Sequence, residues 1–191
     1  LKLTGEGEIF YLQDRVGVNN KTIRIIKFAT MLKNSENIGT GIYTAKNDPR
    51  ILPFGNFLRK SKINELPQIF NILLGDISIV GPRPLIRRTF ELYKIEHQNI
   101  IHSMKPGLTG IGSIIFRNEE EILNNTDMNL EEFYEMNITP YKAKLEMWYK
   151  KNRSFLCDLK IIFLTAWVIV YKNSKLPWLF FKSLPRNNKI S

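Results

Sequence analysis

The residues best suited to chemistry lie between positions 55 and 85. Asn64 and Glu65 form a polar pair just after a basic segment, residues 59–62. Arg83 follows within a stiff Gly-Pro-Arg-Pro sequence. One carboxylate close to several cations, with rigid residues on both sides, is how an anion-handling site could be built. The same residues also suit an ordinary capped helix, so both an anion-handling site and a purely structural role are open at this point.

The elements around these residues are predicted from apolar spacing and turn residues. A helix is expected to begin at Asn64, a good N-cap, and to end at Gly75, a natural C-terminal stop. Apolar residues recur between them at helical spacing, and Pro67 is tolerated because it would lie in the first turn. Residues 77–80 predict a short buried strand or extended run. The prolines that follow would fix the next part of the backbone.

The N-terminal part of the chain predicts a hairpin and then a loop. Residues 8–12 and 22–28 alternate well enough for two short strands, and residues 17–20 between them have turn chemistry. Residues 33–50 are polar and contain glycine and other turn formers, so a solvated connection is expected. Residues 56–60 would then form a basic helical turn.

The second half of the chain is predicted to be mainly helical. Helices are expected over residues 86–103, 139–153 and 155–171. The second of these would open at Thr139 and Pro140, an N-cap and first-turn pair. Residues 108–117 predict a turn and an extended segment that delivers Arg117 from a strand end. Seven acidic and no basic residues between 118 and 135 indicate an exposed acidic helix or loop. The fold class is therefore α+β, mainly helical with a small β-hairpin sheet.

Composition narrows the class of partner. The chain has 191 residues, enough for one domain or one domain with a tail, and 43% of them are hydrophobic, which suits a buried core. Its formal net charge of +10 suggests an anionic partner, such as nucleic acid, a membrane surface or a phosphorylated substrate. Cys157 is the single cysteine, which excludes an intramolecular disulfide and a cysteine-based metal cluster.

The C-terminal part bears on membrane association. Residues 161–171 are uncharged, but this run is only about half of the roughly 20 residues that a spanning helix needs. It predicts a core helix or a helix at a membrane surface. Residues 171–191 combine basic and aromatic residues without acids, which favours an anchor to anionic lipid over a frayed basic tail. The sequence begins at Leu1 instead of a methionine, so an upstream piece is expected.

Several segments together resemble the bacterial sugar transferase family, the small monotopic phosphoglycosyl transferases that start glycan assembly on polyprenyl phosphate. The resemblance covers roughly residues 9–170, and the segments follow the family's order. They are RVG (15–17), KFATM (27–31), NDPR (47–50), FG (54–55), KINELPQ (62–68), GDISIVGPRP (75–84), KPGLTG (105–110) and DLK (158–160). Each is weak alone, whereas ELPQ followed by GPRP is specific.

The resemblance implies an enzyme at the cytoplasmic face of the bacterial inner membrane. It would move a sugar phosphate from a UDP-sugar to polyprenyl phosphate with release of UMP, using Mg²⁺. In the family, an Asp-Glu pair provides the nucleophile and the metal ligand, which places Asn64 and Glu65 at the catalytic positions. The remaining family positions imply substrate or nucleotide binding by Lys27, Arg83, Pro84, Arg117 and Glu146. The transferase domain would span residues 1–171, followed by the basic aromatic tail, residues 172–191.

The sequence departs from the family at the nucleophile. Asn64 is a neutral amide and lacks the anionic oxygen that attacks phosphorus. Three readings follow: attack by Glu65 or directly by the acceptor phosphate, an Asn-Glu branch of the family, or a catalytically silent relative that still binds nucleotide sugar or membrane. As a helix N-cap, Asn64 would need no chemical role. A structural membrane adaptor and a basic nucleic-acid-binding module are alternatives from other classes, the latter disfavoured because the basic residues are dispersed.

Overall fold

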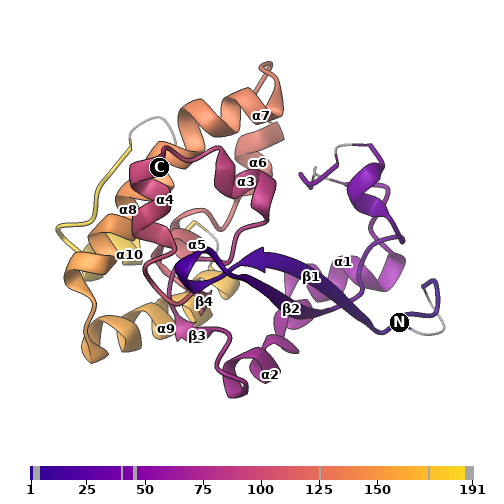
Figure 1. The fold of residues 1–191 in the computed structure, drawn as a ribbon, viewed down its shortest axis with the longest axis horizontal. Coiled ribbons are helices and arrows are strands. Elements are labelled where there is room, and N and C mark those ends of the chain that lie inside the picture. Colours follow the sequence, from indigo (N-terminus) through magenta and orange to yellow (C-terminus); the bar gives the residue numbers. More distant parts are fainter. Residues whose placement is uncertain (2–4, 40, 45–46, 125, 172, 188–191) are drawn as a thin grey trace.

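The computed structural model describes residues 1, 5–39, 41–44, 47–124, 126–171 and 173–187. In this part of the chain, helices dominate and the strands form two small two-stranded sheets (Figure 1), so the mainly helical mixed fold is confirmed. The elements are β1 (Phe10–Val16), η1 (Val18–Asn20), β2 (Thr22–Phe28), η2 (Ser35–Asn37), α1 (Pro53–Lys60), η3 (Ile63–Glu65), α2 (Gln68–Leu73), β3 (Ser78–Val80), α3 (Arg87–Glu91), α4 (Ile95–Ile101), β4 (Gly107–Thr109), α5 (Ile111–Ile115), α6 (Glu119–Asn124), α7 (Leu130–Phe133), η4 (Tyr134–Ile138), α8 (Thr139–Asn152), α9 (Phe155–Val170) and α10 (Leu176–Phe180). Among these helices, none has both the length and the apolar character needed to cross a bilayer.

The predicted hairpin is confirmed. Strands β1 and β2 pair antiparallel from Phe10 opposite Phe28 to Val16 opposite Thr22, and η1 forms the turn. The first strand begins later and runs further than the expected 8–12, because it pairs with the whole of β2. Alternation along β1 puts every second side chain on one face of the hairpin.

The described residues of the connection before α1 pack around Arg50. The Arg50 guanidinium donates to the carbonyl oxygens of Ser35, at 2.6 Å, and Tyr43, at 2.7 Å. It also forms an ion pair with Asp48, at 2.6 Å, and both side chains are buried. A buried guanidinium paired in this way satisfies backbone carbonyls that would otherwise lack partners. The Asp-Pro-Arg segment therefore has a structural role: it closes the loop.

The region from Lys62 to Gly75 differs from its prediction in one respect. Lys62 has a left-handed backbone (φ 62°) and starts the 3-10 turn η3, and Pro67 takes the N-cap position of α2 without a side-chain cap bond. The prediction that Asn64 is a helix N-cap is therefore wrong, because Asn64 lies inside η3 with its side chain buried. The helix does end at Gly75, whose φ of +82° is the left-handed conformation that glycine favours.

Two glycine-containing segments cross at very short range. Strands β3 and β4 pair in parallel, and the amide of Gly81 donates to the carbonyl of Thr109 at 2.9 Å. A Cβ at Gly81, Gly107 or Gly110 would overlap backbone atoms of the opposite segment. Glycine is required here because two backbones need to approach without side chains between them. We call this close approach of Gly81 to Gly107 and Gly110 the glycine crossing. It fixes the loop that carries Arg83 against β4.

Helices in the second half depart from the sequence-based expectation at three places. The expected helix 86–103 is divided into α3 and α4, since Tyr93 between them turns into the core with 3% exposure. Residues 111–115 form helix α5 and not an extended segment, because Ile111 and Ile114 are buried at helical spacing. Helix α8 begins at Thr139 as predicted, but Thr139 is not an N-cap, because the π-helical turn η4 leads directly into it.

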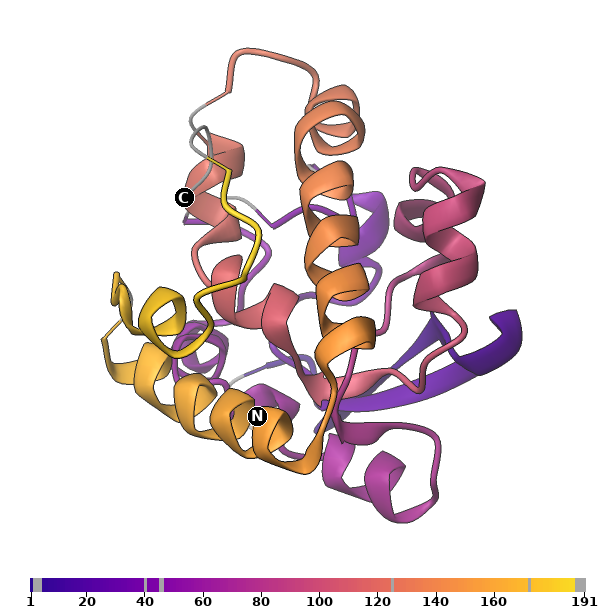
Figure 2. The same cartoon turned by 90° about the vertical axis from the view of Figure 1, so that its left-hand side faces the viewer.

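Helices α8 and α9 organise the main core, and Figure 2 shows α9 running away to one side from the lower end of α8. The C-terminal segment packs against them: Phe181 and Leu184 are buried, and the Tyr141 hydroxyl donates to the carbonyl of Pro185 at 3.0 Å. The frayed-tail alternative is therefore wrong for residues 173–187. Residues 172 and 188–191 of the predicted tail lie outside the described part of the chain.

Candidate functional site

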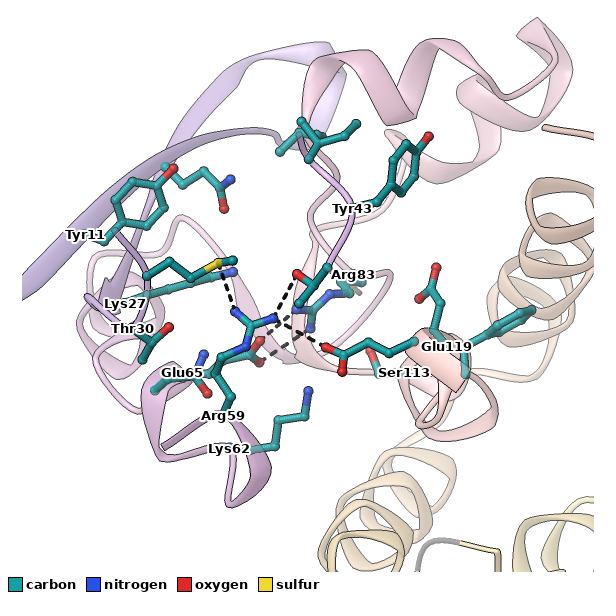
Figure 3. Close-up of a pocket in the computed structure, with 18 of the residues that line it drawn as sticks. Tyr11, Lys27, Thr30, Tyr43, Arg59, Lys62, Glu65, Arg83, Ser113 and Glu119 are labelled. Carbon is teal, nitrogen blue, oxygen red and sulfur yellow. Dashed lines mark hydrogen bonds and ion pairs between the residues drawn. The ribbon is translucent and has the colours of Figure 1, made fainter. Parts of the chain in front are cut away.

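The structure gathers most of the predicted site residues around one large cavity of about 1440 Å³. Its walls come from the hairpin, the 33–50 loop, α1, η3, the loop after β3, and the segment from α5 to α6. The predicted residues that line it are Lys27, Asn64, Glu65, Arg83, Arg117 and Glu146. Figure 3 shows the labelled side chains of Lys27, Lys62, Glu65 and Arg83 directed toward the same space.

Glu65 and Arg83 form the central pair of the cavity. Arg83 Nη2 donates to Glu65 Oε1 at 2.7 Å, and Nη1 donates to Oε2 at 3.4 Å, so both carboxylate oxygens are engaged (Figure 3). Burial alone would raise the pKa of Glu65, but the charges of Arg83, Lys27 and Lys62 outweigh it and hold that pKa well below its usual range. Glu65 is therefore a buried carboxylate that stays ionised at physiological pH.

Asn64 is buried beside Glu65 with an unpaired oxygen. Its side chain lines the cavity, and among the described residues its Oδ1 has no hydrogen-bond partner. A buried amide oxygen without a partner is destabilising by about 1–3 kcal/mol, so its retention points to a partner that a ligand supplies. The position can accept a hydrogen bond or coordinate a cation, but it has no charge with which to attack phosphorus.

Lys27 and Arg15 line the cavity on the hairpin side. Burial lowers the pKa of Lys27 well below its usual range, and the charge of Arg15 acts in the same direction. Burial also lowers the pKa of Arg15 to about 10, with Arg83 contributing. Cations that repel one another in a partly buried space are stabilised when an anion enters. Sequence reasoning missed Arg15, although alternation along β1 places it on the same face as Tyr11, the partner of Lys27 in the hairpin.

Pro84 and Arg117 have different surroundings from those expected. Pro84 is buried but does not line the cavity, and its carbonyl oxygen accepts a hydrogen bond from Arg15 Nη1 at 3.1 Å. It therefore positions Arg15 and is not at the cavity wall. Arg117 lines the cavity from the end of α5, with Nη2 donating to the carbonyl of Lys60 at 3.1 Å. Its Nε is buried and has no partner among the described residues.

Glu146 lies on α8 at the buried side of the cavity. It is 6% exposed, and burial raises its pKa to about 7, with Lys142 and the backbone of Gly112 opposing. A Cβ on Gly112 would lie 2.6 Å from Glu146 Oε1, so glycine makes room for the carboxyl group. Lys142, one turn earlier on α8, is held by Glu119 at 2.7 Å. Glu146 is therefore a carboxyl group that can hold or release a proton near neutral pH.

Arg59 and Lys62 are among the further cations that line the cavity and were not identified as site residues from the sequence. Arg59 Nη2 donates to Thr44 Oγ1 at 2.9 Å and forms an ion pair with Glu120 at 3.4 Å, which joins α1 to the opposite wall (Figure 3). Lys62 extends from the residue that starts η3. Their position beside the Asn-Glu pair in a basic segment was the available signal, but nothing in that spacing says which basic side chains turn inward.

The side chains of Asn64 and Glu65 offer the cavity a small number of oxygen ligands for a magnesium ion. Mg²⁺ takes oxygen ligands and commonly uses one or two carboxylates together with substrate phosphates. Glu65 and the unpaired Oδ1 of Asn64 are adjacent in η3 and both line the cavity. In the described part of the chain, no three His, Cys, Asp or Glu residues come together as a metal cluster. A bound ion would therefore depend on phosphate oxygens from a ligand.

Known proteins resemble this chain over most of its length. The UDP-glucose:undecaprenyl-phosphate glucose-1-phosphate transferase of Escherichia coli K12 is 36% identical over 169 residues, which is 87% of this chain and 33% of that protein. The undecaprenyl-phosphate galactose phosphotransferase of Salmonella typhimurium is 31% identical over 181 residues, or 87% of this chain and 34% of that protein. The exopolysaccharide production protein ExoY of Sinorhizobium fredii is 31% identical over 179 residues, covering 86% and 71%.

The chain thus spans about a third of the length of the first two relatives and most of the third. Residues 1–172 match the bacterial sugar transferase family as a whole. This range contains every residue that lines the cavity. On this evidence of sequence and extent, the chain belongs to the bacterial sugar transferase family.

Proposed function

We propose that this chain is a phosphoglycosyl transferase that moves a sugar 1-phosphate from a UDP-sugar to polyprenyl phosphate and releases UMP. The observation that carries the proposal is the ionised Glu65 paired with Arg83 in a cavity lined by further cations. A donor diphosphate and an acceptor phosphate repel one another, so a site that brings them together needs fixed positive charge. The names of the relatives supply the donor and acceptor classes.

Each cation then has a distinct place around the phosphates. Arg83 is fixed by the glycine crossing and by Glu65, so its planar fork is held ready for an anion. Lys27 and Arg15 approach from the hairpin, and Arg117 approaches from α5. We further propose that Mg²⁺ binds at Glu65 and the Asn64 oxygen with the donor diphosphate, where it would screen the charge on the transferred phosphoryl group.

A membrane surface is the proposed location of the reaction, because polyprenyl phosphate is a lipid. The supporting observation is a group of exposed apolar side chains on α2 and α9, which lie along the lower side in both views (Figure 1 and Figure 2). They include Leu66, Ile69, Phe70, Leu73, Leu74, Phe155, Leu156, Leu159 and Phe163. We call them the α2–α9 apolar face. We propose that it lies on the cytoplasmic leaflet of the bacterial inner membrane, attracted by the net positive charge.

UMP release tests the proposed function. The purified chain, mixed with undecaprenyl phosphate, Mg²⁺ and a panel of UDP-sugars, should release UMP with at least one donor. Omitting the lipid or chelating the metal should remove this release. Glu65→Gln keeps the shape but removes the charge that Arg83 and the metal need, so release should fall by about 10³-fold.

Glu91→Gln is the matched control, because Glu91 is exposed on α3 and does not line the cavity. It should release UMP at the wild-type rate. A wild-type chain that releases no UMP with any donor, yet binds UDP-sugars in calorimetry, would be the silent relative and would contradict the transferase proposal.

A further inference from the structure

One wall of the cavity carries two oxygen atoms that have no partner. Among the described residues, Ser113 Oγ and Glu146 Oε2 are buried and make no hydrogen bond. Both residues line the cavity, and Figure 3 shows Ser113 on the same side as Glu119, across from Lys27 and Thr30. Buried polar atoms are nearly always paired, with protein, water or a ligand. These two oxygens therefore mark a place where the cavity is built to receive hydrogen bonds.

The packing of α5 on α8 brings the two oxygens to one region. Gly112 precedes Ser113 in α5, and a Cβ on Gly112 would lie 2.6 Å from Glu146 Oε1. The carboxyl group thus lies directly against the helix that carries Ser113. Glu146 is only 6% exposed, so the surrounding packing holds its side chain in place. Two polar side chains fixed in this way can select between ligands that differ in the position of one hydroxyl group.

Different cations face the two carboxyl groups of the cavity. Arg83 donates to Glu65 at 2.7 Å, and this pair is the centre of the proposed phosphate site. Burial raises the pKa of Glu146, and Lys142 is the charge that opposes this shift. Lys142 is itself held by Glu119 at 2.7 Å. A phosphate beside Glu146 would be repelled once that carboxyl group is ionised, so an uncharged part of the ligand fits there better.

The partners that the two oxygens lack are hydrogen-bond donors. A carboxylate oxygen can only accept, and a serine hydroxyl can accept or donate. A sugar ring offers hydroxyl groups on adjacent carbons, whereas the pairing edge of uracil offers a single N–H. Arg117 follows the end of α5 and donates to the carbonyl of Lys60 at 3.1 Å, close in sequence to Glu65. The same wall therefore runs from the two oxygens toward the phosphate site, in the order in which a nucleotide sugar carries sugar and phosphate.

We propose that Ser113 and Glu146 bind hydroxyl groups of the transferred sugar and thereby select the donor. Glu146 Oε2 accepts from one hydroxyl, and Ser113 Oγ exchanges a hydrogen bond with another. Gly112 contributes by leaving room for the carboxyl group. This proposal rests on the proposed function for the class of donor, a UDP-sugar.

Calorimetry with UDP and with UDP-sugars separates contacts to the sugar from contacts to the rest of the donor. UDP contains the uracil, the ribose and two phosphates but no transferred sugar. The titrations use the purified chain with Mg²⁺ and without lipid, and a panel of UDP-hexoses and UDP-N-acetylhexosamines. They are run at pH 8, where Glu146, with a pKa of about 7, is mostly ionised.

Two variants remove one contact each. Ser113→Ala deletes the hydroxyl group, and Glu146→Gln replaces a charged acceptor by an amide of the same shape. Each should raise the Kd of the preferred UDP-sugar by about 5–10-fold and leave the Kd of UDP within about twofold. Ser113→Ala should keep the wild-type Tm, because Ser113 Oγ makes no hydrogen bond among the described residues.

Deoxy analogues of the preferred donor identify the hydroxyl groups that are bound. The analogue that lacks the hydroxyl facing Ser113 should bind the wild type about 5–10-fold more weakly than the complete donor. Ser113→Ala should bind that analogue and the complete donor equally well, since the contact is already lost. The same holds for Glu146→Gln and its own hydroxyl. A general disturbance of the cavity would weaken every analogue alike and would contradict the proposal.

Ser103→Ala and Glu91→Gln are the matched controls. Both residues are exposed and neither lines the cavity. Each control should bind UDP and every UDP-sugar as the wild type does.

The outcomes distinguish this proposal from the proposed function. Equal weakening of UDP and UDP-sugars would place the two residues at the nucleotide, and unchanged binding in both variants would show that they touch no donor. Either result overturns the sugar site, while UMP release by the wild type would leave the transferase function standing. A loss of binding confined to UDP-sugars, in a chain that releases no UMP, would support the sugar site and contradict transfer.

Discussion

At the scale of single residues, the cavity contains charges that depend on one another. Glu65 stays ionised only because Arg83, Lys27 and Lys62 surround it, and those cations are held close together only because Glu65 lies among them. Removing Arg83 would leave the buried charge of Glu65 without its closest partner, which is destabilising. The cations around Glu65 outnumber this single carboxylate. An incoming diphosphate would therefore supply negative charge that the cavity lacks.

Glu146 gives a test of how burial of one carboxyl group changes its pKa and the stability of the fold. In the folded chain its pKa is about 7, above its ordinary value of 4.5. The folded state therefore binds the proton more tightly, and the free energy of unfolding should fall as pH rises from about 4.5 to about 7 and stay low above that. Glu146→Gln cannot ionise, so near pH 8 it should be about 1–3 kcal/mol more stable than the wild type.

Urea unfolding at a series of pH values measures this difference. The two proteins should converge at about pH 4, where Glu146 is protonated in both states. Parallel stability curves across the whole range would show that Glu146 is ionised in the folded chain and that its burial is offset by a partner.

At the scale of elements, the glycine crossing connects the fold to the site. Gly110→Ala would place a methyl group against the carbonyl of Gly81, and should cost about 2–3 kcal/mol or more. It should also slow UMP release, because Arg83 lies two residues beyond Gly81. Gly75→Ala is the comparison: its φ of +82° strains alanine by about 1 kcal/mol, but no atom lies near the new methyl group.

Urea unfolding and UMP release distinguish the two glycine variants. Gly75→Ala should lose a little stability and keep its activity, since its methyl group would meet no atom within 4 Å and Gly75 does not line the cavity. An equal loss of stability in the two variants would mean that the β3 and β4 segments can separate to admit a side chain.

The same elements show how far the sequence alone predicts this protein. The hairpin and α9 follow from alternation and from a long apolar run, which are local signals. The N-cap role of Asn64 failed because Lys62 adopts a left-handed backbone that no local preference of lysine indicates. The N-cap role of Thr139 failed because the π-helical residues before it are already helical, and their widened turn accommodates Pro140, which lacks an N–H group. Tertiary packing decides both cases.

The residues of the candidate site likewise divide into those that the sequence identified and those that it did not. The resemblance of short segments to a family identified Glu65, Arg83 and Lys27, which do line one cavity. The resemblance predicted that Pro84 binds the substrate. In the structure, the carbonyl oxygen of Pro84 accepts a hydrogen bond from Arg15, and Pro84 does not line the cavity. The inward direction of Lys62 and Arg59 depends on backbone dihedrals and on contacts across the cavity, which residue spacing does not encode.

At the scale of the whole molecule, the cavity and the α2–α9 apolar face meet where η3 ends and the chain leads into α2. Glu65 ends η3 and lines the cavity, while Leu66, the next residue, is 59% exposed on the apolar face. Strand β3 packs against α9 and continues into the loop that carries Arg83. A lipid phosphate held at the membrane surface would therefore have a short route to the charged residues.

Vesicle binding tests this arrangement. Leu73 and Leu74 are 78% and 73% exposed at the end of α2, so Leu73→Gln/Leu74→Gln should leave stability unchanged. The double variant should sediment less with vesicles that contain anionic lipid, since two inserted side chains are worth about 1.5–3 kcal/mol each when fully buried. Binding should weaken with salt, because part of it comes from the positive charge of the protein.

Ile95→Gln is the matched control for the vesicle experiment. Ile95 is 76% exposed on α4, away from the lower side that carries α2 and α9 (Figure 1). Its variant should sediment as the wild type does. Equal losses from both variants would indicate nonspecific adsorption and contradict the assigned face.

The widened turn at Tyr134–Ile138 affects how this chain would respond to a change in length. A π-helical turn holds one residue more than an α-helical turn, so deleting one residue there would restore regular winding. Each residue advances a helix by about 100°, so α7 would rotate by that amount about α8. Glu146 would keep its place on α8, while Glu131 would leave its partner Arg88. A change of length at this turn can therefore break the contact between α7 and Arg88 and leave Glu146 in its place at the cavity.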